Sequence, residues 1–118
     1  VPACAENFAK ELGTVCVLKC HRTAVSDGHG RVYINRFGNS GMATGGSGDV
    51  LAGILGGLLS QNSKATPSLS PIEAVALGVY IHGLAGEIAE KKYPPFSATI
   101  ERIPDYIPDA LSEIISGK

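Results

Sequence analysis

The interpretation of this chain depends on one glycine-rich stretch, Gly38-Asn-Ser-Gly-Met-Ala-Thr-Gly-Gly-Ser-Gly-Asp-Val-Leu-Ala-Gly53. Six of its sixteen residues are glycine, and it leads directly into an apolar segment with helical spacing. Backbone N–H groups at the start of a helix have no partner within the helix, so they can bind an anion. Glycine lets the backbone approach such a ligand without a Cβ atom in the way. The stretch therefore predicts an anion site at Gly45, Gly46, Ser47 and Gly48.

Asp49 follows these glycines and adds a carboxylate to the same helix start. The helix dipole favours the ionised carboxylate, and an ionised carboxylate within reach of a hydroxyl can act as a general base. Asp49 is thus the candidate catalytic residue. Asp49 and Asn39 are the candidate contacts to the substrate. A simpler interpretation is that Ser47 or Asp49 only caps the helix and that Asn39 only shapes the loop, because these residue types favour such positions.

Composition places the chain among ordinary folded proteins. Its 118 residues are 44% hydrophobic and 18% charged, which suits one globular domain with a core. A net charge of −1 gives no electrostatic reason to expect nucleic acid or an anionic membrane as a partner. No uninterrupted apolar run reaches the length of about 18 residues typical of a membrane span. Three cysteines without Cys-x-x-Cys spacing argue against a disulfide framework or a zinc site, so a cytoplasmic location is expected.

The first third of the sequence predicts a helix, a strand and a hairpin. Residues Ala3–Leu12 have the spacing of an amphipathic helix with Phe8 and Leu12 on its apolar side. The run Thr14–Lys19 is apolar and β-branched, which is typical of a parallel strand buried on both faces. Alternating segments at 23–26 and 31–35 flank a turn sequence and predict a hairpin.

The last two thirds predict helices. A helix is expected from Asp49 to Gln61, and its three glycines imply close packing against another backbone, since each would otherwise cost about 1 kcal/mol. Ser70-Pro71, followed by Glu73, has the pattern of a helix N-terminus. The segment Pro71–Lys92 is apolar nearly all round and predicts a buried helix, in which His82 is more simply a core residue than a catalytic one. Two short helices are expected at 97–103 and 108–116. Their inner face would comprise Ile100, Ile103, Ile107, Leu111, Ile114 and Ile115.

The glycine-rich stretch resembles the signature of the ADP- or ATP-dependent NAD(P)H-hydrate dehydratases, a branch of the ribokinase-like superfamily. Two further segments are similar to the same family, in its order and at about its spacing: Val17-Leu-Lys-Cys-His-Arg-Thr23 and Leu77-Gly-Val-Tyr-Ile-His-Gly-Leu-Ala-Gly86. The resemblance implies an α/β, ribokinase-like three-layer sandwich. Residues 1–118 would be the C-terminal part of that single domain: a buried strand, a β-hairpin, the glycine loop and then helices.

The resemblance also implies a reaction and a set of site residues. The terminal phosphate of ADP or ATP, accompanied by Mg²⁺, would pass to the hydroxyl of hydrated NADH or NADPH, and loss of phosphate would restore the dihydropyridine. Asp49 would be the base, and no protein residue is assigned as a metal ligand. Besides the glycine loop, the nucleotide would be held by Lys19, Cys20, His21, Arg22 and Thr23. Separately from the resemblance, the glycine-rich, apolar helices indicate extensive burial against other chains or missing segments, and a homo-oligomer is expected.

Two departures from the family pattern leave alternatives open. Cys20 stands where the family has glycine, and the family's domain is longer at its N-terminal side. A ribokinase-like kinase acting on a hydroxymethylpyrimidine or thiazole alcohol would use the same Gly-x-Gly-Asp chemistry. A non-catalytic nucleotide-binding remnant would retain the loop without turnover.

Overall fold

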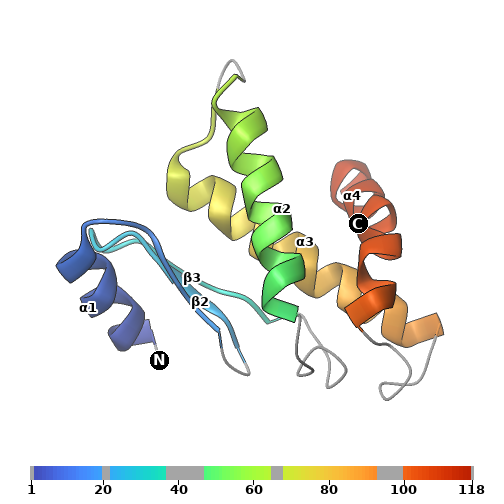
Figure 1. Cartoon of the computed structure of the whole chain (residues 1–118), viewed down its shortest axis with the longest axis horizontal. Helices are drawn as coiled ribbons and strands as arrows, with labels where there is room; N and C mark the ends of the chain where they lie inside the picture. Colours follow the sequence, from blue (N-terminus) through green and yellow to red (C-terminus); the bar gives the residue numbers. More distant parts are fainter. Residues whose placement is uncertain (1, 20–21, 37–46, 65–67, 93–99, 118) are drawn as a thin grey trace. The chain divides into compact units, whose positions relative to one another are not determined.

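The computed structural model describes residues 2–19, 22–36, 47–64, 68–92 and 100–117 (Figure 1). Over these ranges the chain forms, in order, α1 (Pro2–Leu12), β1 (Cys16–Leu18), β2 (Ala24–Ser26), β3 (Val32–Ile34), α2 (Ser47–Asn62), α3 (Pro71–Lys92), the 3₁₀ helix η2 (Ile100–Tyr106) and α4 (Ile107–Ser116). The α/β class predicted from the sequence is therefore confirmed.

The chain divides into two compact units, which are described separately. The first unit comprises Val1–Arg36 and Leu55–Val79, and the second comprises Phe37–Ile54 and Tyr80–Lys118. The first unit contains α1, the sheet, the end of α2 and the first part of α3. The second unit contains the start of α2, the rest of α3, η2 and α4.

The sheet of the first unit is antiparallel, with strand order β1-β2-β3. The predicted hairpin is confirmed as β2 and β3, with Ala24 opposite Ile34 and Ser26 opposite Val32. In its turn, the Asp27 carboxylate accepts hydrogen bonds from the backbone N–H groups of His29 at 2.8 Å and Arg31 at 3.2 Å. The His29 N–H is the main reason why the pKa of Asp27 lies below its ordinary value, since it stabilises the charged form.

The prediction of a parallel strand buried on both faces is wrong for this sheet. The strand is shorter than predicted, Cys16–Leu18, its residues are half-buried, and it pairs antiparallel with β2. Among the described residues β1 is an edge strand. A short apolar run has the same appearance in a buried parallel strand and in a half-buried one, because strand direction depends on pairing that the run itself does not encode.

Helix α1 lies against the sheet (Figure 1), and the side chains that it buries there are small. Ala5 and Ala9 are buried, whereas Phe8 and Leu12 are 49% and 69% exposed, so the predicted apolar side of this helix is wrong. The physical reason is close approach: a Cβ at Gly28 in the hairpin turn would lie 2.8 Å from the backbone nitrogen of Lys10. A helix this near to another backbone contacts it through alanine.

Glu6 connects α1 to the hairpin by hydrogen bonds. Its Oε1 accepts from the hydroxyl of the fully buried Ser26 at 3.0 Å and from the Gly30 N–H at 3.5 Å. The Ser26 Oγ accepts in turn from the Gly28 N–H at 3.2 Å. The buried hydroxyl is therefore satisfied, as buried polar groups require.

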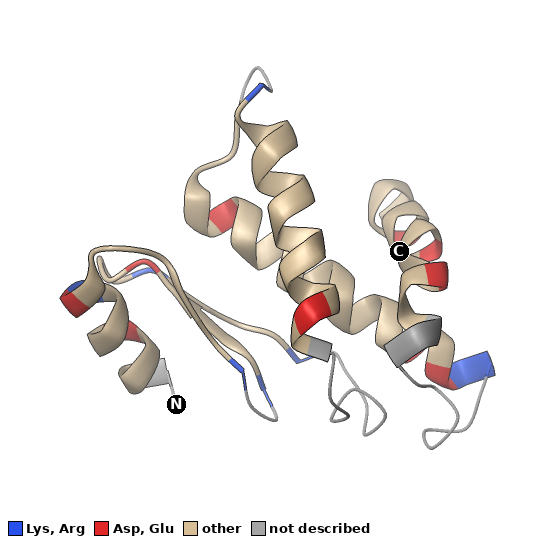
Figure 2. Cartoon of the chain, viewed as in Figure 1, with Lys and Arg blue, Asp and Glu red and all other residues tan. Residues whose placement is uncertain are grey.

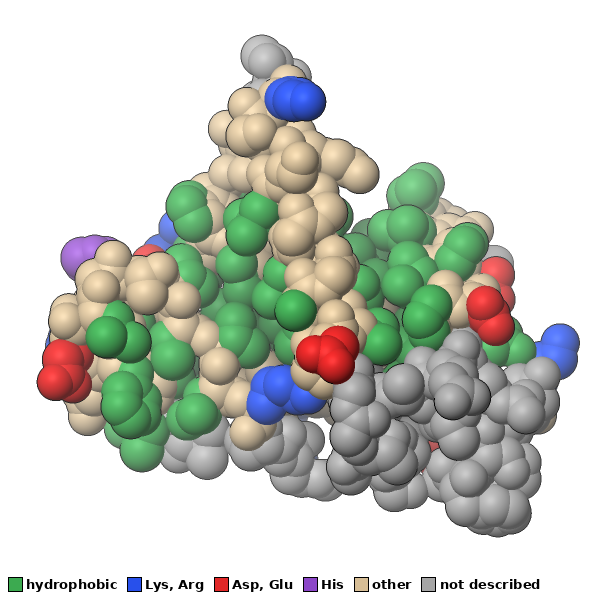
Figure 3. Space-filling model, viewed as in Figure 1, with side chains coloured by type: hydrophobic (Ala, Val, Ile, Leu, Met, Phe, Trp, Pro, Cys, Tyr) green, Lys and Arg blue, Asp and Glu red, His purple; other side chains and the backbone are tan. Residues whose placement is uncertain are grey.

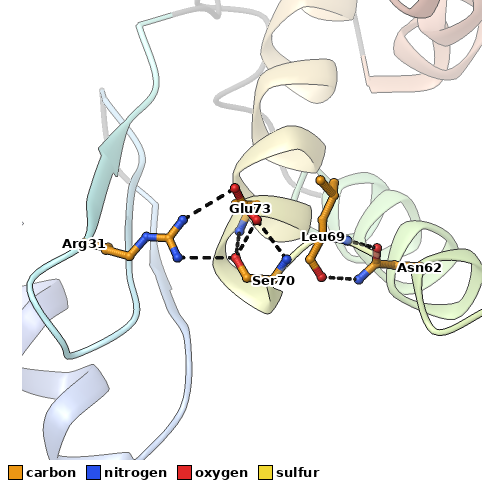
Figure 4. Close-up of polar contacts among 5 residues, drawn as sticks. All are labelled: Arg31, Asn62, Leu69, Ser70 and Glu73. Atoms are coloured by element: carbon orange, nitrogen blue, oxygen red, sulfur yellow. Dashed lines mark hydrogen bonds and ion pairs between the residues drawn. The ribbon is translucent and has the colours of Figure 1, made fainter. Parts of the chain in front are cut away.

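The start of α3 is fixed by a capping box (Figure 4). The Ser70 N–H and hydroxyl both donate to Glu73 Oε1, at 2.9 and 2.8 Å, and the Glu73 N–H donates to Ser70 Oγ at 3.4 Å. Arg31 reaches this cap from the hairpin, with its Nη2 3.7 Å from Glu73 Oε2. Asn62 joins the end of α2 to Leu69 through two hydrogen bonds, so the loop between the helices is held at both of its described ends.

The prediction that the glycines of α2 pack closely against another backbone is wrong within the part of the chain that the structure describes. A Cβ at Gly53, Gly56 or Gly57 would have nothing within 4 Å. Leu51 is buried, but Leu59 is 40% exposed. Helix α2 thus buries Leu51, half-buries Ile54, Leu55 and Leu58, and leaves its three interior glycines exposed.

Helix α3 is a core helix, as predicted. In the first unit Ile72, Val75 and Val79 are buried, and in the second unit Ile81 and His82 are buried. By length and composition α3 is apolar enough to cross a membrane, but 61% of its apolar window is buried within the protein. That burial is typical of the core helix of a folded domain.

The C-terminal elements differ in part from the prediction. The first is a 3₁₀ helix at Ile100–Tyr106, and residues 97–99 of the expected helix lie outside the described residues. Ile103 and Ala110 are fully buried, whereas Leu111 and Ile115 are 38% and 84% exposed, so their assignment to the inner face is wrong. The inward face of α4 contains Ala110, and Leu111 and Ile115 lie about 100° and about 140° round the helix from it, as 3.6 residues per turn require. Hydrophobic side chains are accordingly visible on the surface of α4 (Figure 3).

Candidate functional site

The start of α2 carries the residues expected to bind phosphate and act as base. Helix α2 begins at Ser47, two residues before the predicted start, so Gly48 and Asp49 lie in its first turn. Both are exposed. Asp49 is the only charged residue in the sequence of α2 (Figure 2). An accessible carboxylate therefore stands beside backbone N–H groups that lack helical acceptors, which suits both proton abstraction and binding of a negatively charged group.

The connection between β1 and β2 carries the second group of predicted residues. Lys19 and Arg22 are exposed and Thr23 is half-buried. Lysine and arginine bind phosphate by charge-assisted hydrogen bonds, and a threonine hydroxyl can donate to it as well. The described residues of this connection thus have the chemistry expected of a nucleotide contact.

The remaining predicted site residues fall largely outside the described residues. They are Asn39, Gly45 and Gly46 of the glycine loop and Cys20 and His21 of the β1–β2 connection. Ser47 is the first residue of α2. Lys19, Arg22 and Thr23 belong to the first unit, and Gly48 and Asp49 belong to the second.

Asn35 is a buried polar residue that the sequence analysis did not single out. It follows β3 directly and is 5% exposed. Its backbone N–H donates to the Thr23 carbonyl at 2.9 Å, and its side-chain Nδ2 donates to the Val79 carbonyl at 3.3 Å. The available signal was an asparagine at the end of an alternating strand, but the sequence alone does not show whether such a residue faces solvent or core.

No group of three or more His, Cys, Asp or Glu side chains able to hold a metal ion occurs among the described residues. Asp49 supplies one carboxylate at the candidate site. Mg²⁺ commonly takes one or two carboxylates and completes its octahedral shell with substrate phosphates and water. The donor set at the start of α2 therefore fits a metal that is held mainly by a nucleotide.

Comparison with known proteins assigns this set of features to a family. The sequence profile of the NAD(P)H-hydrate dehydratase family matches residues 1–109. A bifunctional NAD(P)H-hydrate repair enzyme Nnr from Moorella thermoacetica is 41% identical over 110 residues, which is 93% of this chain but 20% of that protein.

Solved structures show the same relationship at the level of the fold. An ADP/ATP-dependent NAD(P)H-hydrate dehydratase from Bacillus subtilis, co-crystallised with ATP/Mg²⁺, superposes with a TM-score of 0.83 at 28% identity, over 95% of this chain and 38% of that one. A ribokinase-like superfamily protein from Enterococcus faecalis superposes with a TM-score of 0.65 at 34% identity, over 93% of this chain and 37% of that one. The chain thus spans about a fifth to two fifths of the length of these three proteins.

These matches confirm the ribokinase-like fold class expected from the glycine-rich stretch. They also confirm the family resemblance stated from the sequence motifs. The chain belongs to the NAD(P)H-hydrate dehydratase family.

Proposed function

We propose that this chain is the C-terminal part of a single ribokinase-like domain that dehydrates (S)-NAD(P)H hydrate to NAD(P)H at the expense of ADP or ATP. The observation that carries the proposal is Asp49: an exposed carboxylate in the first turn of α2, directly after the glycine-rich stretch. Family membership supports the choice of reaction, and the structural similarity to the ADP/ATP-dependent dehydratase of Bacillus subtilis supports the choice of nucleotide.

The proposed chemistry has two steps. Asp49 takes the proton of the hydrate hydroxyl, whose oxygen then forms a bond to the terminal phosphorus while the bond from that phosphorus to the nucleotide's bridging oxygen breaks. Phosphate next leaves with the electrons of its carbon–oxygen bond, and loss of a ring proton completes the dihydropyridine. The backbone N–H groups near Gly48 oppose the negative charge that builds up on the transferring phosphoryl group.

Contacts to the nucleotide would come from two places in the chain. The proposed phosphate-side contacts are Gly45, Gly46, Ser47 and Gly48. Lys19, Arg22 and Thr23, with Cys20 and His21, would contact the nucleotide from the β1–β2 connection, and Asn39 would contact the hydrate. Mg²⁺ would neutralise phosphate charge beside Asp49. A homo-oligomer in the cytoplasm completes the proposal, and the exposed hydrophobic residues of α1 and α4 support association with further protein surface.

The test measures NADH absorbance formed from hydrated NADH in the presence of Mg²⁺ and either ADP or ATP. Three proteins are compared: this chain, a chimera in which it replaces the matching part of the Bacillus subtilis dehydratase, and the chimera carrying Asp49→Asn. We expect the chimera to be active and Asp49→Asn to reduce kcat by about 10²–10⁴-fold, the usual contribution of a general base.

Asp109→Asn is the matched control, because Asp109 is an exposed aspartate in the first turn of α4. It should leave turnover unchanged. A chimera that binds nucleotide and leaves the hydrate untouched would overturn the dehydratase proposal. Phosphorylation of a hydroxymethylpyrimidine or thiazole alcohol would then identify a kinase, and binding without any turnover would identify a remnant.

A further inference from the structure

Asn35 makes hydrogen bonds in three directions from a buried position at the end of β3. Its Oδ1 accepts from the Tyr33 hydroxyl at 2.9 Å, and its Nδ2 donates to the carbonyl of Val79 in α3 at 3.3 Å. Its backbone N–H donates to the carbonyl of Thr23 at 2.9 Å, one residue before β2. All four residues belong to the first unit.

These bonds connect the core helix to a proposed nucleotide contact. Nδ2 fixes the end of β3 to α3, and the backbone bond extends the β2–β3 ladder so that it also fixes Thr23. A 5%-exposed amide is costly to rotate, because each of its polar ends would lose its partner in a position largely shielded from solvent. Residue 35 also lies only three positions before the glycine-rich stretch that begins at Gly38.

We propose that Asn35 is a positioning residue for nucleotide binding, acting through Thr23. The inference rests on the proposed function, because it requires that Thr23 contacts the nucleotide. Asparagine is suited to this position because one side chain supplies both the acceptor for the Tyr33 hydroxyl and the donor for the Val79 carbonyl. Leucine would remove both bonds, and a carboxylate would keep the acceptor but lose the donor.

Asn35→Asp gives the sharpest test, since its effect depends on pH. The ionised aspartate places an acceptor against the Val79 carbonyl, whereas the protonated form again has a donor for that carbonyl. Burial raises the pKa of such a group above its ordinary value of about 3.9. The Tyr33 phenol is a titratable group that hydrogen-bonds to this side chain, and it is neutral from pH 5 to pH 8 because an ordinary tyrosine has a pKa of about 10.

The experiment measures the Kd of Mg·ADP for the chimera and its Asn35→Asp variant from pH 8 to pH 5, under conditions where both are folded by circular dichroism. We expect the variant to bind about tenfold more weakly at pH 8, the cost of one lost buried hydrogen bond. The ratio of the two Kd values should fall toward one as the pH is lowered. Asn35→Leu should show a ratio that does not change with pH.

Asn62→Asp is the matched control, because Asn62 also donates from Nδ2 to a backbone carbonyl, that of Leu69. It should lower stability without changing the Kd. If Asn35→Asp does not fold at pH 8, Tyr33→Phe replaces it, and weaker ADP binding is expected because Oδ1 loses its donor. Equal Kd values for Asn35→Asp and the unsubstituted chimera at every pH would overturn the positioning role alone. Failure of the unsubstituted chimera to bind ADP would overturn the proposed function and this inference with it.

Discussion

At the scale of single residues, the prediction of which side chains of α1 are buried failed, because the space between the helix and the sheet admits only small side chains. Phe8 and Leu12 have the right spacing for a buried face, yet Ala5 and Ala9 occupy the contact with the sheet. The distance between two backbones sets the largest side chain that fits between them, and a hydrophobic pattern does not contain that distance. The same close approach makes Gly28 the most constrained described glycine of the hairpin turn.

Gly28→Ala should destabilise the protein strongly. Gly28 has φ +77°, and an added Cβ would lie 2.8 Å from Lys10 N and 2.9 Å from the carbonyl carbon of Ala9. The left-handed conformation costs about 1–2 kcal/mol with a Cβ, and overpacking adds about 1–3 kcal/mol. Urea unfolding followed by circular dichroism measures the change in the free energy of unfolding.

Gly30→Ala is its control, since Gly30 has φ +92° and open space around the position of a Cβ. It should show only the conformational cost of about 1–2 kcal/mol. Equal losses for the two variants would contradict the close contact between the turn and α1.

At the scale of elements, the start of α3 and the hairpin turn were predicted correctly, whereas the buried sides of α1 and α4 were not. Ser70, Pro71 and Glu73 indicated the start of α3, and the structure has the corresponding reciprocal hydrogen bonds. The hairpin followed in the same way from its turn residues. These signals are local, because the side chain and the backbone group that it binds are only a few residues apart. Strand direction in β1 is not local, and its prediction was wrong.

Ser70→Ala should destabilise the protein by about 1 kcal/mol, the usual cost of losing an N-cap side chain. The Ser70 hydroxyl both donates to the Glu73 carboxylate and accepts from the Glu73 N–H, and the variant loses both bonds. Thermal unfolding at neutral pH measures the effect. Ser63→Ala, which removes one hydroxyl bond to a backbone carbonyl at the end of α2, is the comparison variant and should cost less. An unchanged Tm for Ser70→Ala would contradict the role of the capping box.

Glu73 should make stability depend on pH in the acidic range. The Ser70 N–H, followed by the Ser70 hydroxyl, holds the pKa of Glu73 below its ordinary value of 4.5. A carboxyl whose pKa is lowered by folding stabilises the folded state above the unfolded pKa, and this contribution is lost as the pH falls through the folded pKa. Tm should therefore fall less steeply from about pH 5 to pH 3 in Glu73→Gln than in the unsubstituted protein.

Glu113→Gln is the charge-matched reference for this series, because it removes one carboxylate from α4. The measured quantity is the difference between the slopes of Tm against pH for the two variants. Identical slopes in Glu73→Gln and the unsubstituted protein would rule out a contribution from the cap.

At the scale of the whole molecule, the open side of α2 is the main departure from expectation. Each of its three interior glycines costs about 1 kcal/mol relative to alanine, yet a Cβ at each would meet nothing within 4 Å among the described residues. Together with the exposed Phe8, Leu12 and Ile115, this leaves apolar surface uncovered on several elements. The chain spans only 20% to 38% of the relatives reported above. The residue patterns of α1, α2 and α4 therefore predicted more buried apolar surface than the described residues of this chain bury.

Gly57→Ala should stabilise the 118-residue chain by about 1 kcal/mol, because alanine is the better helix former and the site has room. In the chimera the same change should be neutral or destabilising if the added protein covers α2. Urea unfolding of both proteins measures the difference. Ala52→Gly, at an exposed position of the same helix, should destabilise both by about 1 kcal/mol. Destabilisation of the isolated chain by Gly57→Ala would contradict the open surface.

The sequence by itself determined the class of fold, the helix and hairpin boundaries to within a few residues, and the family. It could do so because periodicity, caps, turn residues and the glycine-rich stretch act over a few neighbouring positions. Only the tertiary structure decided that β1 pairs antiparallel, that alanines rather than Phe8 face the sheet, and that Asn35 joins Thr23 to α3. Each of these depends on the distance between backbones that are far apart in the chain, and no local pattern of residues encodes that distance.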